Sequence, residues 1–178
     1  LSRFMPPSRA AERLFVLVAL ALLAGLLRHD IARRTVRQRG LTRFIAVCLL
    51  SGYFWLAVGG AVILAAGLAP GGPAYDAALH ALLLGFVFAM VFGHAPIIFP
   101  AVLRVAVPYH PGFYAPLVLL HVSLALRLAG DASGGIELVR WGALLSALAL
   151  VSFIANTVAA VLRGWRAGAR AADKAAAL

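Results

Sequence analysis

Charged residues, and acidic residues in particular, are scarce in this sequence. Only 12% of its 178 residues are charged and only six are Asp or Glu, whereas 63% are hydrophobic. The mean hydropathy is +0.97. Soluble domains carry about twice this charged share, so the composition excludes an ordinary soluble domain. We therefore predict an integral membrane protein whose fold is all-α, a polytopic transmembrane helix bundle.

Other absences narrow the possible functions. No acidic residue falls in the middle of a hydrophobic segment, where a proton-coupled carrier normally keeps a carboxylate. Cys48 is the only cysteine, so no internal disulfide can form, and its apolar surroundings favour an inert buried thiol over a thiolate ligand. The sequence also lacks a glycine-rich phosphate loop, an HExxH pair and a convincing nucleophile beside a base. Nothing in it therefore supports transport by this chain alone or a common catalytic motif.

Hydrophobic segments alternate with short polar stretches. Gly52 and Gly59 lie seven residues apart in one segment, near one helix face, which allows a neighbouring backbone to approach closely. Arg127, near the end of another segment, is expected to snorkel toward the membrane surface. Within a single domain covering residues 1–178 we predict about five transmembrane spans, at residues 10–27, 41–68, 75–103, 115–130 and 137–162.

The basic residues gather where the hydrophobic segments end. Residues 28–43 hold six arginines, and residues 163–178 form a basic tail. Because positive charge is retained in the cytoplasm, we interpret the net charge of +10 as an orientation signal rather than a nucleic-acid surface. We predict a bacterial inner-membrane protein with a cytoplasmic C-terminus. Arg3, Arg9 and Arg13 would then be external, so we expect the chain to be the C-terminal portion of a longer protein.

Four of the five histidines lie within residues 78–126, among aliphatic and aromatic residues. An imidazole that leaves water needs a hydrogen-bond partner, a metal or a wet cavity. His80 and His94 share the third predicted span, where an α-helix would place them about 40° apart on one face. Pro96 and Pro100 are expected to interrupt the helix just beyond His94.

His94 and His121 are expected to lie level on two antiparallel helices, with His110 in the loop that joins them. Two level imidazoles on neighbouring helices suit axial ligation of a haem or coordination of copper. We therefore interpret His94, His121 and His80 as candidate cofactor-binding residues, and His94, His121 and His110 as candidate metal ligands. The alternative is a non-catalytic accessory subunit of a larger membrane complex, whose histidines only bond between helices. His29, in the arginine-rich segment, is interpreted as a solvated loop residue.

Two runs of the sequence, GLTRFIAVCLLSGYFWLAVGG and LHALLLGFVFAMVFGHAPIIFPAVL, resemble the NnrS-type membrane proteins, relatives of the haem-copper oxidase catalytic subunits. The resemblance covers residues 39–126. It implies a helix bundle in the lipid bilayer, accompanied by other membrane subunits or by further helices of the same protein. It also implies a b-type haem, copper or both, linked to nitric oxide, denitrification or respiratory redox chemistry.

By this likeness His80 and His94 match the family's histidine-bearing helix, and HPGFY at His110 resembles the HPEVY copper-ligand motif of the oxidases. HPGFY lacks the acidic residue of that motif, and the chain has far fewer predicted spans than the oxidases. Whether the protein is an enzyme is therefore left open.

Overall fold

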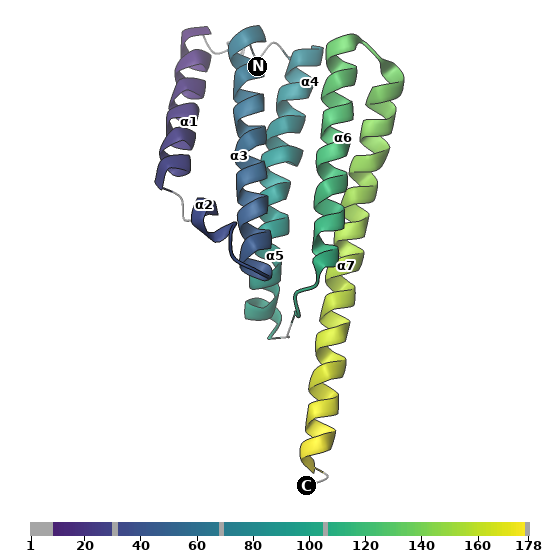
Figure 1. The fold of residues 1–178 in the computed structure, drawn as a ribbon. Helices are drawn as coiled ribbons and strands as arrows, with labels where there is room; N and C mark the ends of the chain where they lie inside the picture. Colours follow the sequence, from purple (N-terminus) through teal and green to yellow (C-terminus); the bar gives the residue numbers. More distant parts are fainter. Residues whose placement is uncertain (1–8, 30–31, 68–69, 105–106, 177–178) are drawn as a thin grey trace, which may run out of the picture.

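The computed structural model describes residues 9–29, 32–67, 70–104 and 107–176. Every regular element among these residues is a helix, and the long helices stand side by side in an elongated bundle (Figure 1). The predicted all-α fold is confirmed. Arg3 and the side chain of His29 lie outside the described residues, so our predictions for them stay predictions.

The chain runs back and forth along the bundle (Figure 1). We call the end that carries α2 the arginine end, and the end where α4 begins and α6 turns into α7 the aspartate end. In chain order the elements are α1 (Arg9–His29), α2 (Ala32–Thr35), α3 (Leu41–Ala66), α4 (Pro73–His80), the π-helix η1 (Ala81–Val87), α5 (Phe88–Leu103), the 3₁₀ turn η2 (Pro111–Phe113), α6 (Tyr114–Ser133) and α7 (Ile136–Ala176).

Within the described part of the chain, four helices are long and apolar enough to cross a membrane, which indicates a lipid bilayer environment. They are Leu41–Ala66, Pro73–Val102, Pro111–Ser133 and Ile136–Arg170. These four match the second to fifth predicted spans. The first predicted span corresponds to α1, a helix of 21 residues, and its crossing of the membrane stays a prediction.

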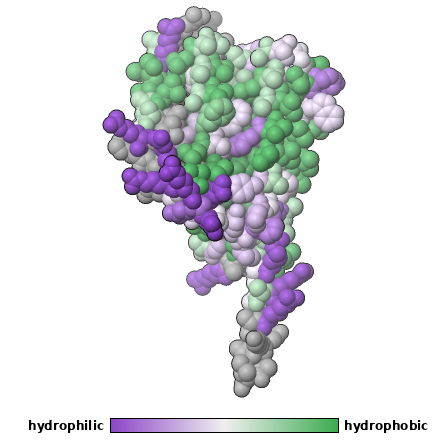
Figure 2. Space-filling view, in the orientation of Figure 1, coloured by the Kyte–Doolittle hydropathy of each residue, from purple (hydrophilic) through white to green (hydrophobic). Residues whose placement is uncertain are grey.

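The last helix is much longer than its predicted span. The predicted span ends at residue 162 and a basic tail follows it, and α7 continues through this tail to Ala176 as one helix of 41 residues. Its length is about 62 Å, twice the thickness of a bilayer core. The basic tail is rich in Ala and Arg, both strong helix formers, and contains no proline. The tail therefore extends α7 beyond the other helices (Figure 1), and hydrophilic side chains lie along the coloured portion of this projecting part in Figure 2.

α3 is the central packing element. It contacts α1 and α2 on one side and α4, η1 and α5 on the other, while α6 packs against α4, η1 and α7. A side chain at Gly52 would meet the backbone oxygen of Phe86 at 3.4 Å, and one at Gly59 would meet that of Ala78 at 3.4 Å. The predicted close approach at these two glycines is thus confirmed. It brings α3 against the segment that carries two of the histidines.

Aromatic and leucine side chains fill the space between the helices. Phe92 of α5 stacks on Phe153 of α7, with ring centroids 4.1 Å apart, and the Phe44 ring of α3 lies 5.7 Å from Phe113. The largest fully buried side chains include Phe44, Phe92, Phe113, Leu117, Leu120 and Leu124. This core joins α3, α5, α6 and α7, and it holds the histidine-bearing helices in fixed orientations.

Candidate functional site

The segment that carries His80 and His94 is not one continuous α-helix. α4 ends at His80, the π-helix η1 follows, and α5 begins at Phe88. A π turn takes one residue more than an α turn, so side chains beyond it are displaced by about 100° from their α-helical positions. The predicted common face of His80 and His94 therefore does not hold. His80 is partly buried beside Asp76, whereas His94 is exposed on the outside of the bundle.

α5 continues through both of its prolines. We expected Pro96 and Pro100 to interrupt the helix, but α5 remains helical from Phe88 to Leu103. Each proline lacks an N–H, so the carbonyl four residues earlier loses its helical hydrogen bond. The loss is local, because α5 stays helical on both sides of each proline.

His80 and His94 share one bonding pattern although they face different ways. The Nδ1 atom of His94 lies 2.7 Å from the backbone oxygen of Met90, and Nδ1 of His80 lies 2.8 Å from that of Asp76. A carbonyl oxygen only accepts, so Nδ1 carries the proton in each neutral ring and Nε2 keeps its lone pair. Metal-ligating histidines typically have this arrangement. Both imidazoles therefore fit the role of a ligand through Nε2.

His121 is bonded in the opposite way. The indole Nε1 of Trp55 donates a hydrogen bond to Nδ1 of His121 at 2.9 Å, and the two ring centroids lie 6.2 Å apart. An indole N–H only donates, so Nδ1 must accept and the neutral ring carries its proton on Nε2. That Nε2 is buried and has no hydrogen-bond partner among the described residues. While the Trp55 bond exists, Nε2 has no lone pair for a metal, and His121 does not fit the predicted ligand role.

The π-helix makes the space that Trp55 occupies. Gly85 lies inside η1, and a Cβ at this position would overlap the Cβ and Cγ atoms of Trp55. Isolated π turns inside α-helices are frequent at functional sites. Here the π turn and the absence of a side chain at Gly85 let the indole of Trp55 pack against η1. In this position the indole contacts His121 on α6.

His110 lies in the connecting loop, as predicted, and is exposed. Its Nδ1 accepts a hydrogen bond of 3.0 Å from the backbone N–H of Gly112, at the start of η2. Within the described ranges, no three His, Cys, Asp or Glu side chains lie close enough to hold one metal ion. The structure thus does not bring His94, His121 and His110 together as the copper set that the sequence predicts.

A second polar cluster lies at the aspartate end. Arg127 of α6 donates a hydrogen bond to Oδ2 of Asp76 on α4, and its Nε lies 3.7 Å from Oδ2 of Asp131. Only 17% of the Arg127 side chain is exposed, so it turns into the bundle instead of snorkelling. His80 joins the cluster through its 3.5 Å contact with Oδ1 of Asp76. The ends of α4 and α6 are therefore linked by charged side chains.

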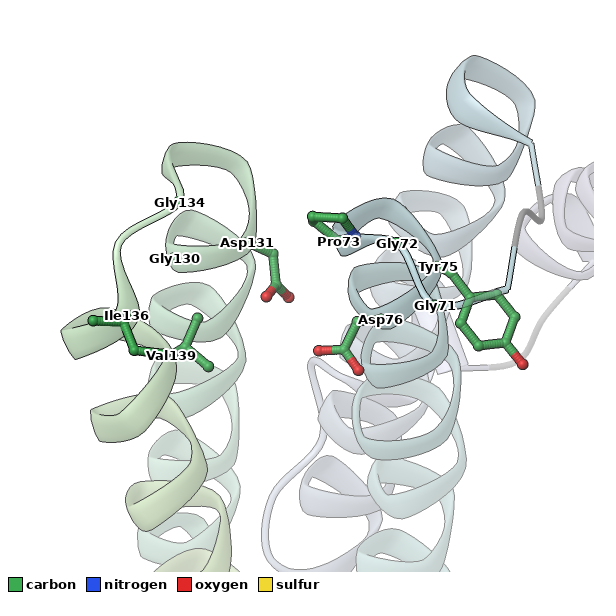
Figure 3. Close-up of a pocket in the computed structure, with 10 residues that line it drawn as sticks. All are labelled: Gly71, Gly72, Pro73, Tyr75, Asp76, Gly130, Asp131, Gly134, Ile136 and Val139. Carbon is green, nitrogen blue, oxygen red and sulfur yellow. The ribbon is translucent and has the colours of Figure 1, made fainter.

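This cluster borders a cavity of about 500 Å³ (Figure 3). The carboxylates of Asp131 and Asp76 point toward each other across the gap between α6 and α4, and Tyr75 points away from it. Glycines from both turns and two apolar side chains of α7 complete the wall. The lining residues are Gly71, Gly72, Pro73, Tyr75, Asp76, Gly130, Asp131, Gly134, Ile136 and Val139.

Sequence reasoning missed both tertiary contacts. The Trp55–His121 bond joins residues 66 positions apart and has no local signal. The aspartate end did have a local signal in the sequence. It contains two pairs of residues spaced four apart, as in helical ion pairs: Asp76 with His80, and Arg127 with Asp131. Two such pairs near the ends of neighbouring helices indicate a charged contact between them.

Comparison with known proteins gives one match. Residues 3–162 match the model of a family described as a domain of unknown function, DUF8744. No curated protein and no solved structure matches the chain. Because the family model spans most of its length, the chain belongs to the DUF8744 family.

Proposed function

We propose that this protein binds a b-type haem on the outer face of α5, through Nε2 of His94, within a larger membrane assembly. The position of His94 supports this function. Nine residues separate His94 from the end of α5 at Leu103, about 14 Å along the axis, which lies inside a hydrocarbon core about 30 Å thick. His94 is nevertheless exposed on the bundle surface.

An imidazole facing hydrocarbon needs a partner for each ring nitrogen. Nδ1 of His94 is satisfied by the Met90 carbonyl. Nε2 makes no hydrogen bond within the described part of the chain and His94 is exposed, so Nε2 is accessible to a group from outside the chain. Haem iron is one such group, and the imidazole of His94 would hold it through Nε2.

The surroundings of His94 favour haem over copper. Protein copper sites generally need several nitrogen or sulfur ligands, and the described residues contain no group of three potential ligands. Haem needs one imidazole from this chain together with a large apolar surface. The exposed residues beside His94 on the outside of the bundle are apolar: Val87, Val91, Ile97, Ile98 and Val102.

The likeness to NnrS-type proteins points to the same class of cofactor. Haem, when bound, supplies one-electron redox chemistry and an open site for small gases such as nitric oxide. The residues of α5 would hold the cofactor and exclude water from one side of it. A further membrane subunit, or a second copy of this chain, would cover the other side.

The interior of the bundle favours a second candidate, an accessory subunit without a cofactor. His121 bonds to Trp55 across two helices, as expected of a histidine that only stabilises packing. If His94 has the same kind of role, a polar group on another subunit would bond its Nε2. The two candidates thus differ in what contacts the outer face of α5.

A visible absorption spectrum separates the two candidates. The protein would be purified in mild detergent, with and without added hemin, and reduced with dithionite. Haem ligation predicts a saturable Soret band that shifts on reduction. A featureless spectrum after removal of unbound hemin contradicts the haem proposal and favours the accessory subunit. Copper analysis of the same sample tests the remaining alternative.

We also propose that the arginine end faces the cytoplasm of a bacterial inner membrane, since it carries the arginine-rich segment and the basic end of α7. Single cysteines at the exposed positions Arg37 and Arg170 test this orientation. In inside-out vesicles an impermeant maleimide should label both, and in right-side-out vesicles neither. Labelling of the two positions from opposite sides would contradict the orientation.

A further inference from the structure

We propose that the cavity at the aspartate end binds a small organic cation, whose primary ammonium group is held by the carboxylate of Asp131. The cavity lies between the start of α4, the end of α6 and the start of α7 (Figure 3). It is separate from the outer face of α5, so this proposal does not depend on the haem proposal.

The charges around the cavity do not balance. Asp76 and Asp131 carry two negative charges, and among the described residues Arg127 supplies the one positive charge that pairs with both of them. Arg127 donates its hydrogen bond to Asp76, and its Nε stays 3.7 Å from Asp131, beyond hydrogen-bond distance. Of the other titratable groups, His80 contacts Asp76, and Tyr75 points away from the cavity. Together, the two aspartates and Arg127 carry a net charge of −1.

One carboxylate oxygen of Asp131 also lacks a hydrogen-bond donor among the described residues. Only 9% of its side chain is exposed, and its Oδ2 is buried with no hydrogen-bond donor among the described residues. A buried carboxylate oxygen without a donor is costly. Asp131 moreover lies in the last turn of α6, where the helix dipole is negative and disfavours another negative charge. Both effects would be relieved by a cationic donor in the cavity.

The cavity's size and walls indicate the class of cation. A volume of about 500 Å³ lies within the usual range for small-molecule sites. Ile136 and Val139 give the α7 side an apolar wall, which suits a short aliphatic chain. An ammonium group offers three N–H donors to the carboxylates. A metal ion is a poorer fit, because the described residues provide no group of three ligand side chains.

Equilibrium dialysis of radiolabelled n-butylammonium against the detergent-purified chain tests the proposal. We expect saturable binding that unlabelled n-butylammonium displaces and n-butanol does not. Asp131→Asn should lower the affinity about tenfold or more, since it removes the charged acceptor. Glu137→Gln is the matched control, because Glu137 is exposed, pairs with Arg140 and does not line the cavity. Its affinity should equal that of the wild type.

Ile136→Lys provides a second variant in case Asp131→Asn fails to fold. Ile136 lines the cavity but is 61% exposed, so a lysine is tolerated there and places a positive charge beside the site. It too should weaken binding about tenfold. Unchanged affinity in either folded variant overturns the proposal. Displacement of the label by equimolar NaCl also overturns it, since the cavity would then hold an inorganic cation.

Discussion

The outer face of α5 and the interior contact between α3 and α6 each hold one histidine, and the two imidazoles are bonded in opposite ways. Nδ1 of His94 donates to the carbonyl of Met90 on its own helix. Nδ1 of His121 accepts from Trp55 on another helix. The bond at Nδ1 decides which tautomer each ring adopts, and hence whether Nε2 has a lone pair. In the sequence the two histidines look equivalent, because they are expected at the same depth in the membrane. Depth alone does not predict which ring nitrogen carries the proton.

The two regions also differ in how closely their side chains are packed. The interior contact needs a π-helix, a glycine at position 85 and an indole that fits against it. The outer face presents the exposed His94 among exposed aliphatic side chains, and its ring is bonded through Nδ1 to its own helix. Interior substitutions should therefore change stability, and substitutions on the outer face should change what the protein binds.

The largest expected effect is that of His94→Ala on haem binding. Loss of the axial nitrogen should reduce the Soret absorbance of hemin-loaded protein to the level of unbound hemin, while circular dichroism remains that of a folded helical protein. His121→Ala is the matched control and should keep the Soret band. A band that survives in His94→Ala and vanishes in His121→Ala would reverse the comparison between the two regions.

Gly85→Ala should have the next largest effect, on stability. The added Cβ overlaps Trp55, so we expect a loss of about 1–3 kcal/mol in the free energy of unfolding. Gly168→Ala is the control, because nothing lies within 4 Å of the added atom and alanine favours a helix. Unfolding in mixed detergent micelles, followed by circular dichroism, measures both variants. Equal stability of the two would show that the indole does not need the space at Gly85.

Trp55→Phe should have the smallest effect. It keeps an aromatic ring but removes the N–H donor to His121, and we expect it to cost about 0.6–1.7 kcal/mol of stability. Trp141→Phe, at a position that is 57% exposed, should cost nothing measurable in the same unfolding experiment. If His94 is the haem ligand as proposed, a hemin-loaded Trp55→Phe protein should keep its Soret band. Loss of the band would make the interior contact part of the cofactor site.

Hydropathy predicted the fold well because bilayer thickness sets the length of a spanning helix. Four of the five predicted spans appear at nearly their predicted positions, and Gly52 and Gly59 lie where helices pack closely. The helical conformation of the tail was not predicted, because the loss of apolar residues after residue 162 marks the end of a membrane span and not the end of a helix. Helix propensity, rather than hydropathy, decides where an Ala- and Arg-rich segment stops.

The candidate site was less predictable because one local irregularity changes its geometry. Nothing in the run Ala81–Val87 distinguishes a π-helix from an α-helix. The extra residue in that turn separates the faces of His80 and His94. Likewise, the tautomer of His121 depends on Trp55, which only tertiary packing brings near it. Sequence spacing therefore located the candidate histidines but not the ring atoms that they present.

Nitrogen NMR of protein labelled with ¹⁵N-histidine tests the central comparison most directly, with His94→Ala and His121→Ala used to assign the signals. In the haem-free protein we expect the proton on Nδ1 of His94 and on Nε2 of His121. On addition of hemin, the His94 signals should be lost through contact with the paramagnetic iron, and those of His121 should persist. A proton on Nδ1 of His121, or loss of the His121 signals with hemin, would contradict the assignment of His94 as the ligand.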